Sequence, residues 1–175
     1  MPTLLRNHWK KIALTSTALL LLAAIAFWLW LPTHGLGTAK RFLRWKFNDV
    51  QQITTSELAT QLQSANTPVL LDIRARAEFE TSHLPNARHL SPEATYAQIR
   101  SHLAVIPPGR PIVVYCSVGY RSCTMARRIK KLGRTDVSNL EGSIFAWASE
   151  NRPLEPRPRV HPYNWFGHRM LSIER

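Results

Sequence analysis

The hydrophobic residues of this chain fall into one long run near the N-terminus, followed by several short runs. Residues 12–31 form a stretch of 20 residues without a charged side chain. As a helix this stretch would be roughly 30 Å long, which is the thickness of the hydrocarbon core of a bilayer. Lysines precede the stretch and tryptophans lie near its end, as is typical of membrane interfaces. These residues are Lys10, Lys11, Trp28 and Trp30. The pattern predicts a transmembrane helix over residues 12–31, ended by Pro32 and Gly35.

A cleaved secretory signal is the alternative explanation of the same run. Ala24 and Ala26, on either side of Ile25, are small residues of the kind found at a cleavage site. The apolar run continues from Phe27 to Leu31 beyond that point, which a signal peptide does not require. A retained single-pass anchor is therefore favoured.

Basic residues lie on both sides of the run, and the two groups favour opposite orientations of the helix in the membrane. The basic N-terminal segment, residues 1–11, favours an N-terminus inside, whereas the basic and aromatic linker, residues 32–50, favours the reverse. Because the N-terminal charges lie closer to the run, we expect the domain on the outer (periplasmic) face. Within the linker, residues 39–47 either lie along the lipid headgroups or form a solvated connection.

After residue 50 the apolar runs are short, and they alternate with helical patterns. Short strands are expected at 69–73, 87–90, 112–115 and 137–140. Helices are expected at 75–82, 92–104, 122–132 and 144–149, and an earlier one is expected to begin at a capping box formed by Thr54 and Glu57. Such alternation predicts an α/β fold in which helices cover both faces of a parallel sheet.

The distribution of charge argues against nucleic acid as a partner. Of the formal charge of +12, residues 1–47 contribute seven basic and no acidic residues, beside the apolar run. Basic residues in that position are typical of a membrane flank. The C-terminal tail, residues 155–175, is rich in proline and aromatic residues, and we expect it to dock on the domain or on the membrane.

The two cysteines, Cys116 and Cys123, are too few for a disulfide scaffold, and no Cys/His set around them has the spacing of zinc ligands. We therefore expect no metal ion and no cofactor. Cys116 follows a predicted strand and precedes a predicted helix, where backbone N–H groups and the helix dipole stabilise an anion such as a thiolate. Arg121 can hold an oxyanion by paired hydrogen bonds. By spacing alone, a buried cysteine beside a solvated arginine is the alternative.

The segment around Cys116 resembles the active-site loop of the rhodanese family. Two flanking patterns also resemble that family and occur in the family's order. The first comprises Asp72-Ile73-Arg74, Glu78-Phe79, His83-Leu84-Pro85 and Ala87, and the second comprises Leu140-Glu141-Gly142-Ser143-Ile144 and Trp147. The resemblance implies a rhodanese-like domain over residues 51–154. Ser82, Asn86 and Ser143 replace glycines common in the family, and we expect these departures to alter the scaffold without touching the loop.

The resemblance implies sulfur transfer in two steps. Cys116 would take a sulfur atom from a small anionic donor such as thiosulfate, and the resulting persulfide would pass it to cyanide, a thiol or a partner protein. The expected substrate-binding residues are those of the loop: Ser117, Val118, Gly119, Tyr120 and Arg121. The expected structural residues are Asp72, Arg74, Glu78 and His83.

Three other functions are weaker candidates. Phosphatases and arsenate reductases of related fold have a Cys-x5-Arg loop, whereas the spacing from Cys116 to Arg121 is Cys-x4-Arg. A membrane-tethered protein-interaction module is the second alternative. It is either non-catalytic, in which case it would not need Cys116, or a sulfur relay to a partner protein. A dithiol mechanism would use Cys123, which more simply fits a buried helix residue.

Overall fold

The computed structural model describes residues 2–156 and 160–161, without the side chains of residues 2–14 and 31–33. In the described range the domain is built on a five-stranded sheet of order β1-β5-β4-β2-β3, and every pair of neighbouring strands is parallel. The strands are β1 (Gln51–Ile53), β2 (Val69–Asp72), β3 (Arg88–His89), β4 (Ile112–Tyr115) and β5 (Val137–Leu140). The predicted α/β fold with a parallel sheet is therefore confirmed.

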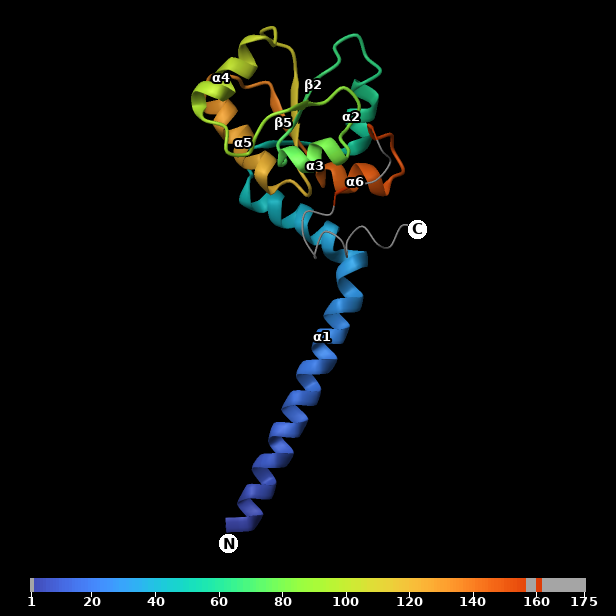
Figure 1. Ribbon diagram of the computed structural model, residues 1–175, viewed down its shortest axis with the longest axis vertical. Coiled ribbons are helices and arrows are strands. Elements are labelled where there is room, and N and C mark those ends of the chain that lie inside the picture. The colour runs from blue at the N-terminus through green and yellow to red at the C-terminus, as the bar shows by residue number, and fades with distance from the viewer. Residues whose placement is uncertain (1, 157–159, 162–175) are drawn as a thin grey trace.

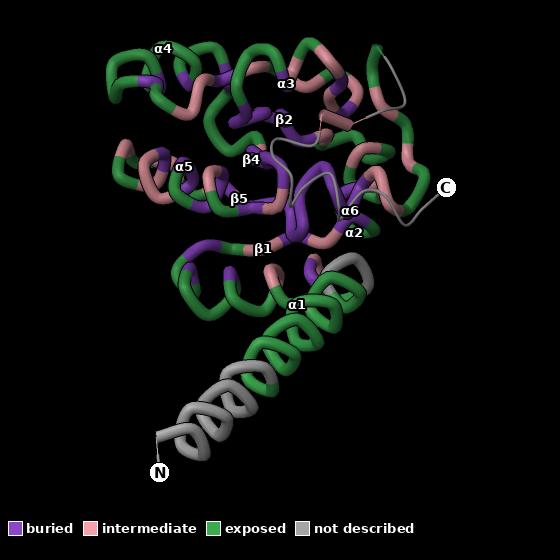
Figure 2. The backbone as a smooth tube through the Cα atoms, turned by 60° about the horizontal axis from the view of Figure 1, so that its bottom comes forward, coloured by how far each residue is buried: buried purple, intermediate pink, exposed green. Residues whose placement is uncertain are grey.

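The central strand β4 and its neighbour β2 are buried along their whole length because helices cover both faces of the sheet (Figure 2). The helices of the domain are α2 (Thr55–Gln61), α3 (Arg76–Thr81), α4 (Tyr96–Ala104), α5 (Tyr120–Lys131) and α6 (Ser143–Ser149). Residues of α4 and α5 share one hydrophobic cluster with Val114, and residues of α2 and α6 share a second cluster with Val113. Neighbouring residues of one strand thus supply opposite cores, as the pleat of a strand requires.

The ends of the helices follow local capping chemistry. Thr54 and Glu57 form the predicted capping box, in which the Glu57 N–H donates to Thr54 Oγ1 at 3.2 Å. Helix α4 begins at Tyr96, later than expected, because Thr95 caps it. Helix α5 begins at Tyr120, earlier than expected.

The N-terminal helix α1 (Pro2–Lys46) differs from the prediction. It does not end at Pro32 and Gly35 but continues to Lys46, so most of the predicted linker, residues 32–50, is helical. Its parts Thr15–Trp30 and His34–Lys46 meet at an angle of 83°. A proline inside a helix removes one backbone hydrogen bond and bends the helix without ending it.

No single helix among the described residues is long and apolar enough to cross a membrane, and only the bent pair in α1 meets that requirement jointly. The first part of the pair projects away from the domain (Figure 1). Its large apolar side chains, such as Leu20 at 72% and Leu29 at 64%, are exposed. The second part lies against the domain, where Leu43, Phe47 and the following Val50 are buried.

The predicted C-terminal tail, residues 155–175, lies outside the described residues except for 155–156 and 160–161. At its start, Glu155 forms an antiparallel bridge with His83, and the His83 N–H donates to the Glu155 carbonyl at 2.7 Å.

Candidate active site

Cys116 follows β4 directly and begins the loop that leads into α5. Its side chain is almost fully buried, with 2% of the residue exposed. The Gly119 N–H donates to Cys116 Sγ at 3.2 Å. Because Gly119 is the residue before the first turn of α5, the sulfur also lies at the positive end of the helix dipole. The strand, loop and helix thus place an amide donor on the sulfur, as the sequence predicts.

The base of this loop is tied to α6. The Ile144 N–H donates to the Cys116 carbonyl and the Phe145 N–H to the Ser117 carbonyl, both at 3.2 Å. The Cys116 N–H donates to Ser143 Oγ at 3.1 Å. The expectation that Ser143 does not touch the loop is therefore wrong. The physical reason is that α6 begins against the loop, so that the Ser143 hydroxyl meets the Cys116 N–H. Ser143 itself has a left-handed backbone, with φ of 53°.

Gly119 occupies a position that a side chain would not fit. Its φ of 124° lies in the region that favours glycine. A β-carbon on Gly119 would also lie 2.9 Å from Leu43 Cδ1 of α1. The second part of α1 therefore packs directly on the loop that carries Cys116.

Arg121 is turned toward Glu78. Its Nη1 donates to Glu78 Oε2 at 2.8 Å, and its Nη2 donates to Glu78 Oε1 at 3.0 Å and to Ser117 Oγ at 2.9 Å. Sequence reasoning places Glu78 in the scaffold, but in the structure its carboxylate fixes two side chains of the loop. A donor anion would have to bind the guanidinium alongside this carboxylate or displace it.

The charge state of Glu78 follows from these contacts. Burial on its own would raise the pKa of Glu78, but the hydrogen bonds from Arg121 and from the Ala75 N–H outweigh burial. The pKa of Glu78 is therefore below its ordinary value, and the pair with Arg121 is ionic at neutral pH.

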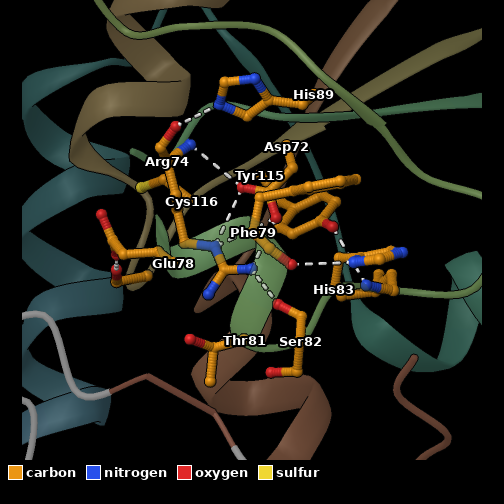
Figure 3. Close-up of polar contacts among 12 residues, drawn as sticks. Asp72, Arg74, Glu78, Phe79, Thr81, Ser82, His83, His89, Tyr115 and Cys116 are labelled. Atoms are coloured by element: carbon orange, nitrogen blue, oxygen red, sulfur yellow. Dashed lines mark hydrogen bonds and ion pairs between the residues drawn. The ribbon is translucent and has the colours of Figure 1, made fainter. Parts of the chain in front are cut away.

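The predicted structural residues form a polar cluster beside the loop (Figure 3). Asp72 and Arg74 make an ion pair in which both side chains are 0% exposed, with Arg74 Nη2 2.6 Å from Asp72 Oδ2. Arg74 also donates to the backbone carbonyl of Ser82, which ties the end of α3 to β2. The His83 ring stacks on Phe79 at 4.0 Å between ring centroids. The structural role expected for Asp72, Arg74 and His83 stays a prediction.

Behind the cysteine lies a polar chain that the sequence does not reveal. Ser122 Oγ lies 3.5 Å from Cys116 Sγ and donates to Asn139 Oδ1 at 2.6 Å. Asn139 Nδ2 in turn donates to Gln52 Oε1 at 2.7 Å. The one sequence signal is Asn139 itself, a polar residue in a predicted buried strand.

Cys123 lies beside Gln52, at the end of this series of hydrogen bonds, and is fully buried. Burial raises the pKa of the Cys123 thiol to about 12. Gln52 Nε2 is 3.6 Å from its sulfur. Its surroundings match the bystander predicted from the sequence.

The remaining loop residues differ in exposure. Val118 is partly buried against the cluster of α2 and α6, whereas Tyr120 is 47% exposed at the rim of the loop. The ring of Tyr120 makes an edge contact with Phe47 at 5.5 Å, and Lys46 Nζ lies 4.9 Å from its centroid.

Within the part of the chain that the structure describes, no group of three or more His, Cys, Asp or Glu side chains could hold a metal ion.

Known sequences resemble the domain that carries Cys116. Residues 54–150 match the model of the rhodanese-like domain. A sulfurtransferase of Allochromatium vinosum is 31% identical over 105 residues, which cover 60% of this chain and 94% of that protein. The probable adenylyltransferase/sulfurtransferase MoeZ of Mycobacterium tuberculosis is 35% identical over 101 residues. The match covers 58% of this chain but only 25% of MoeZ, so this chain resembles one part of that longer protein.

Solved structures share the fold at lower identity. The thiosulfate sulfurtransferase of Pseudomonas aeruginosa aligns with a TM-score of 0.56 and 19% identity over 70% of this chain and 23% of that one. A rhodanese-related protein of Thermoplasma volcanium aligns with a TM-score of 0.51 and 20% identity over 61% of this chain and 99% of that one. These likenesses support the fold alone.

Proposed function

Because the chain belongs to the rhodanese-like domain family, which includes a sulfurtransferase of Allochromatium vinosum, we propose that it transfers a sulfane sulfur through a persulfide on Cys116. The observation that carries the proposal is the Gly119 N–H, which donates to Cys116 Sγ at the start of α5. This arrangement stabilises negative charge on sulfur, both on the thiolate and on a persulfide.

The reaction has two displacement steps. The Cys116 thiolate attacks the outer sulfur of a donor such as thiosulfate, a new S–S bond forms, and sulfite leaves with the electron pair of the old S–S bond. A thiophilic acceptor, cyanide or a thiolate, then attacks the outer sulfur of the persulfide. The bond to Cys116 breaks, and the thiolate is regenerated. The backbone amides of Ser117, Val118, Gly119, Tyr120 and Arg121 are the groups we assign to the negative charge of the persulfide.

Arg121 is the residue we assign to the donor anion. Because a guanidinium holds an oxyanion by paired hydrogen bonds, we expect Arg121→Ala to weaken donor binding more than it slows the chemical step. The loss of a charged hydrogen-bond pair corresponds to about 1.5–3 kcal/mol. Steady-state kinetics with thiosulfate should show a raised KM and a smaller change in kcat, and an unchanged KM would exclude the anion-binding role.

The test of the proposed reaction is the mass of the Cys116 peptide after treatment with thiosulfate. We expect a gain of one sulfur atom that added cyanide removes, with thiocyanate as the product. Cys116→Ser should abolish both signals. Sulfur transfer that survives Cys116→Ser, or hydrolysis of a phenyl phosphate without turnover of thiosulfate, would overturn the proposal.

We also propose that residues 12–31 anchor the domain to a membrane, with the domain on the outer (periplasmic) face. The supporting observation is the row of exposed apolar side chains from Leu19 to Leu29, which nothing in the described part of the chain covers. Protease treatment of intact cells, followed through the C-terminal tail, tests the orientation. Protection of the tail would place the domain inside.

A further inference from the structure

The second part of α1, residues 34–46, has an inner face that belongs to the active-site edge of the domain. Its residues contact the segments that follow β4 and β5, where the sheet presents its carboxyl ends. Leu43 packs on Gly119, and Arg44 forms a paired salt bridge with Glu141 at 2.6 and 2.7 Å. The helix therefore covers the edge of the sheet from which Cys116 extends.

The solvent-facing side of the same helix, which we call the outer face, consists of Arg41, Phe42 and Trp45, with Lys46 at its edge beside Tyr120. Trp45 is 75% exposed and Phe42 is 47% exposed. Their rings lie 6.0 Å apart, and Lys46 Nζ is 5.7 Å from the Phe42 centroid. Residues 34–48 contain no aspartate or glutamate. Aromatic rings interleaved with basic groups are the composition that binds the headgroup region of an anionic membrane.

The bend in α1 fixes how this outer face is oriented relative to the first part of the helix. Residues 34–46 cannot extend the membrane span, because Leu43 and Phe47 are buried on the domain and Arg44 pairs with Glu141. Only the first part of α1 is left to enter the bilayer. If that part runs along the membrane normal, the angle of 83° lays residues 34–46 almost in the plane of the membrane.

We propose that the outer face of residues 34–46 lies on the anionic headgroups of the membrane that holds residues 12–31, so that the edge carrying Cys116 faces the bilayer. The proposal rests on the anchor put forward under the proposed function. The charge complementarity and the continuity of α1 with the apolar run favour a lipid surface over a protein partner. The sulfur acceptor then reaches Cys116 between the domain and the membrane, past Tyr120 and Lys46 at the rim.

Photo-crosslinking of the full chain tests the proposal. The protein is reconstituted in nanodiscs of phosphatidylcholine, with or without phosphatidylglycerol. A benzophenone amino acid replaces one residue at a time: Trp45→p-benzoylphenylalanine for the outer face and Leu21→p-benzoylphenylalanine for the anchor. Val105→p-benzoylphenylalanine is the control, because Val105 is an apolar residue 69% exposed after the end of α4, next to Ile106 and Arg134 on the side of the sheet where β5 begins. Mass spectrometry then identifies lipid adducts.

We expect lipid adducts at positions 21 and 45 and none at position 105, with phosphatidylglycerol increasing the yield at position 45 only. Arg41→Glu should remove that increase, whereas Arg100→Glu, a charge reversal on exposed α4, should leave it unchanged. Adducts at position 21 without adducts at 45 would overturn this inference and leave the anchor standing. No adducts at position 21 would overturn both. A yield at position 45 that does not change with phosphatidylglycerol would also overturn the inference. So would crosslinking in native membranes that gives a protein adduct at position 45 in place of a lipid adduct.

Discussion

At the scale of single residues, Ser143 and Cys123 are two small side chains near the same loop that have different contacts. From these contacts we expect them to affect the loop differently. Ser143 is on the loop side of α6 and accepts a backbone N–H, whereas Cys123 is enclosed in the core behind the loop. A hydrogen bond to the nucleophile's own backbone constrains the loop. A buried thiol packed among apolar groups behaves as a small hydrophobic residue.

Ser143→Ala should destabilise the domain, because it leaves the buried Cys116 N–H without its acceptor. An unsatisfied buried donor costs about 1–3 kcal/mol. Ser143→Gly loses the same acceptor but relieves the left-handed backbone, so we expect it to be about 1 kcal/mol more stable than Ser143→Ala. Urea unfolding of the three proteins measures both differences. A Ser143→Ala variant as stable as the native chain would show that the hydrogen bond contributes nothing.

Cys123 should stay unreactive under conditions in which Cys116 reacts. With its pKa raised to about 12 by burial, Cys123 has almost no thiolate near neutral pH. Iodoacetamide should therefore modify Cys116 alone, as peptide mass mapping can follow, and Cys123→Ala should retain sulfur transfer. A loss of transfer as deep as that of Cys116→Ala would instead place Cys123 in the mechanism.

At the scale of elements, the second part of α1 is an integral part of the domain although it precedes the matched family region, residues 54–150. Phe47 is 2% exposed and stands between the helix and the loop residue Tyr120. Arg127 Cζ of α5 lies 4.5 Å from the Phe47 centroid. The packing of a single helix face thus connects the N-terminal segment to the active-site loop.

A matched pair of phenylalanines on this segment tests that packing. Phe47→Ala should destabilise the domain by about 3–5 kcal/mol, since it empties a buried position. Phe42→Ala, on the exposed outer face, should change stability by no more than about 0.5 kcal/mol. Chemical unfolding of the full chain in detergent gives both values. Equal effects of the two substitutions would mean that the helix does not belong to the folded core.

At the scale of the whole molecule, ion pairs link segments that are distant in the sequence. Glu78 with Arg121 joins α3 to the loop, and Arg44 with Glu141 joins α1 to the segment after β5. Arg134 and Asp136, in contrast, form a local pair in the turn before β5. The pKa of Glu78 is lowered by its bonds to Arg121 despite burial, and the pKa of Asp136 is lowered by the hydrogen bonds from Arg134. The stability of the folded domain therefore depends on pH through these carboxylates.

Folding should weaken as the solution becomes acidic. Because the folded pKa of Glu78 lies below its unfolded value of about 4.3, the unfolded chain binds more protons near that pH. The contribution is complete above about pH 4.3 and disappears as pH falls through the lower folded pKa. Thermal unfolding between neutral and acidic pH should show a falling midpoint, and Glu78→Gln should make that fall shallower. An identical pH dependence of the two proteins would remove Glu78 as a cause.

The sequence by itself determined the features that depend on neighbouring residues. Strand β4, the capping box at Thr54, and the succession of strand, Cys116 loop and helix all follow from short-range pattern, because burial on both faces and helix capping are local requirements. The family patterns around Cys116 added the chemistry, since they lie in continuous segments.

Only the tertiary structure decided which distant groups meet. Strand β1 is too short to have a pattern of its own and exists because it pairs with β5. Three contacts join segments far apart in the chain. They are the ion pair of Glu78 with Arg121, the hydrogen bond from the Cys116 N–H to the Ser143 hydroxyl, and the packing of residues 34–46 over Gly119. The pattern of residue types along the sequence does not predict such contacts, because they depend on how the helices pack on the sheet.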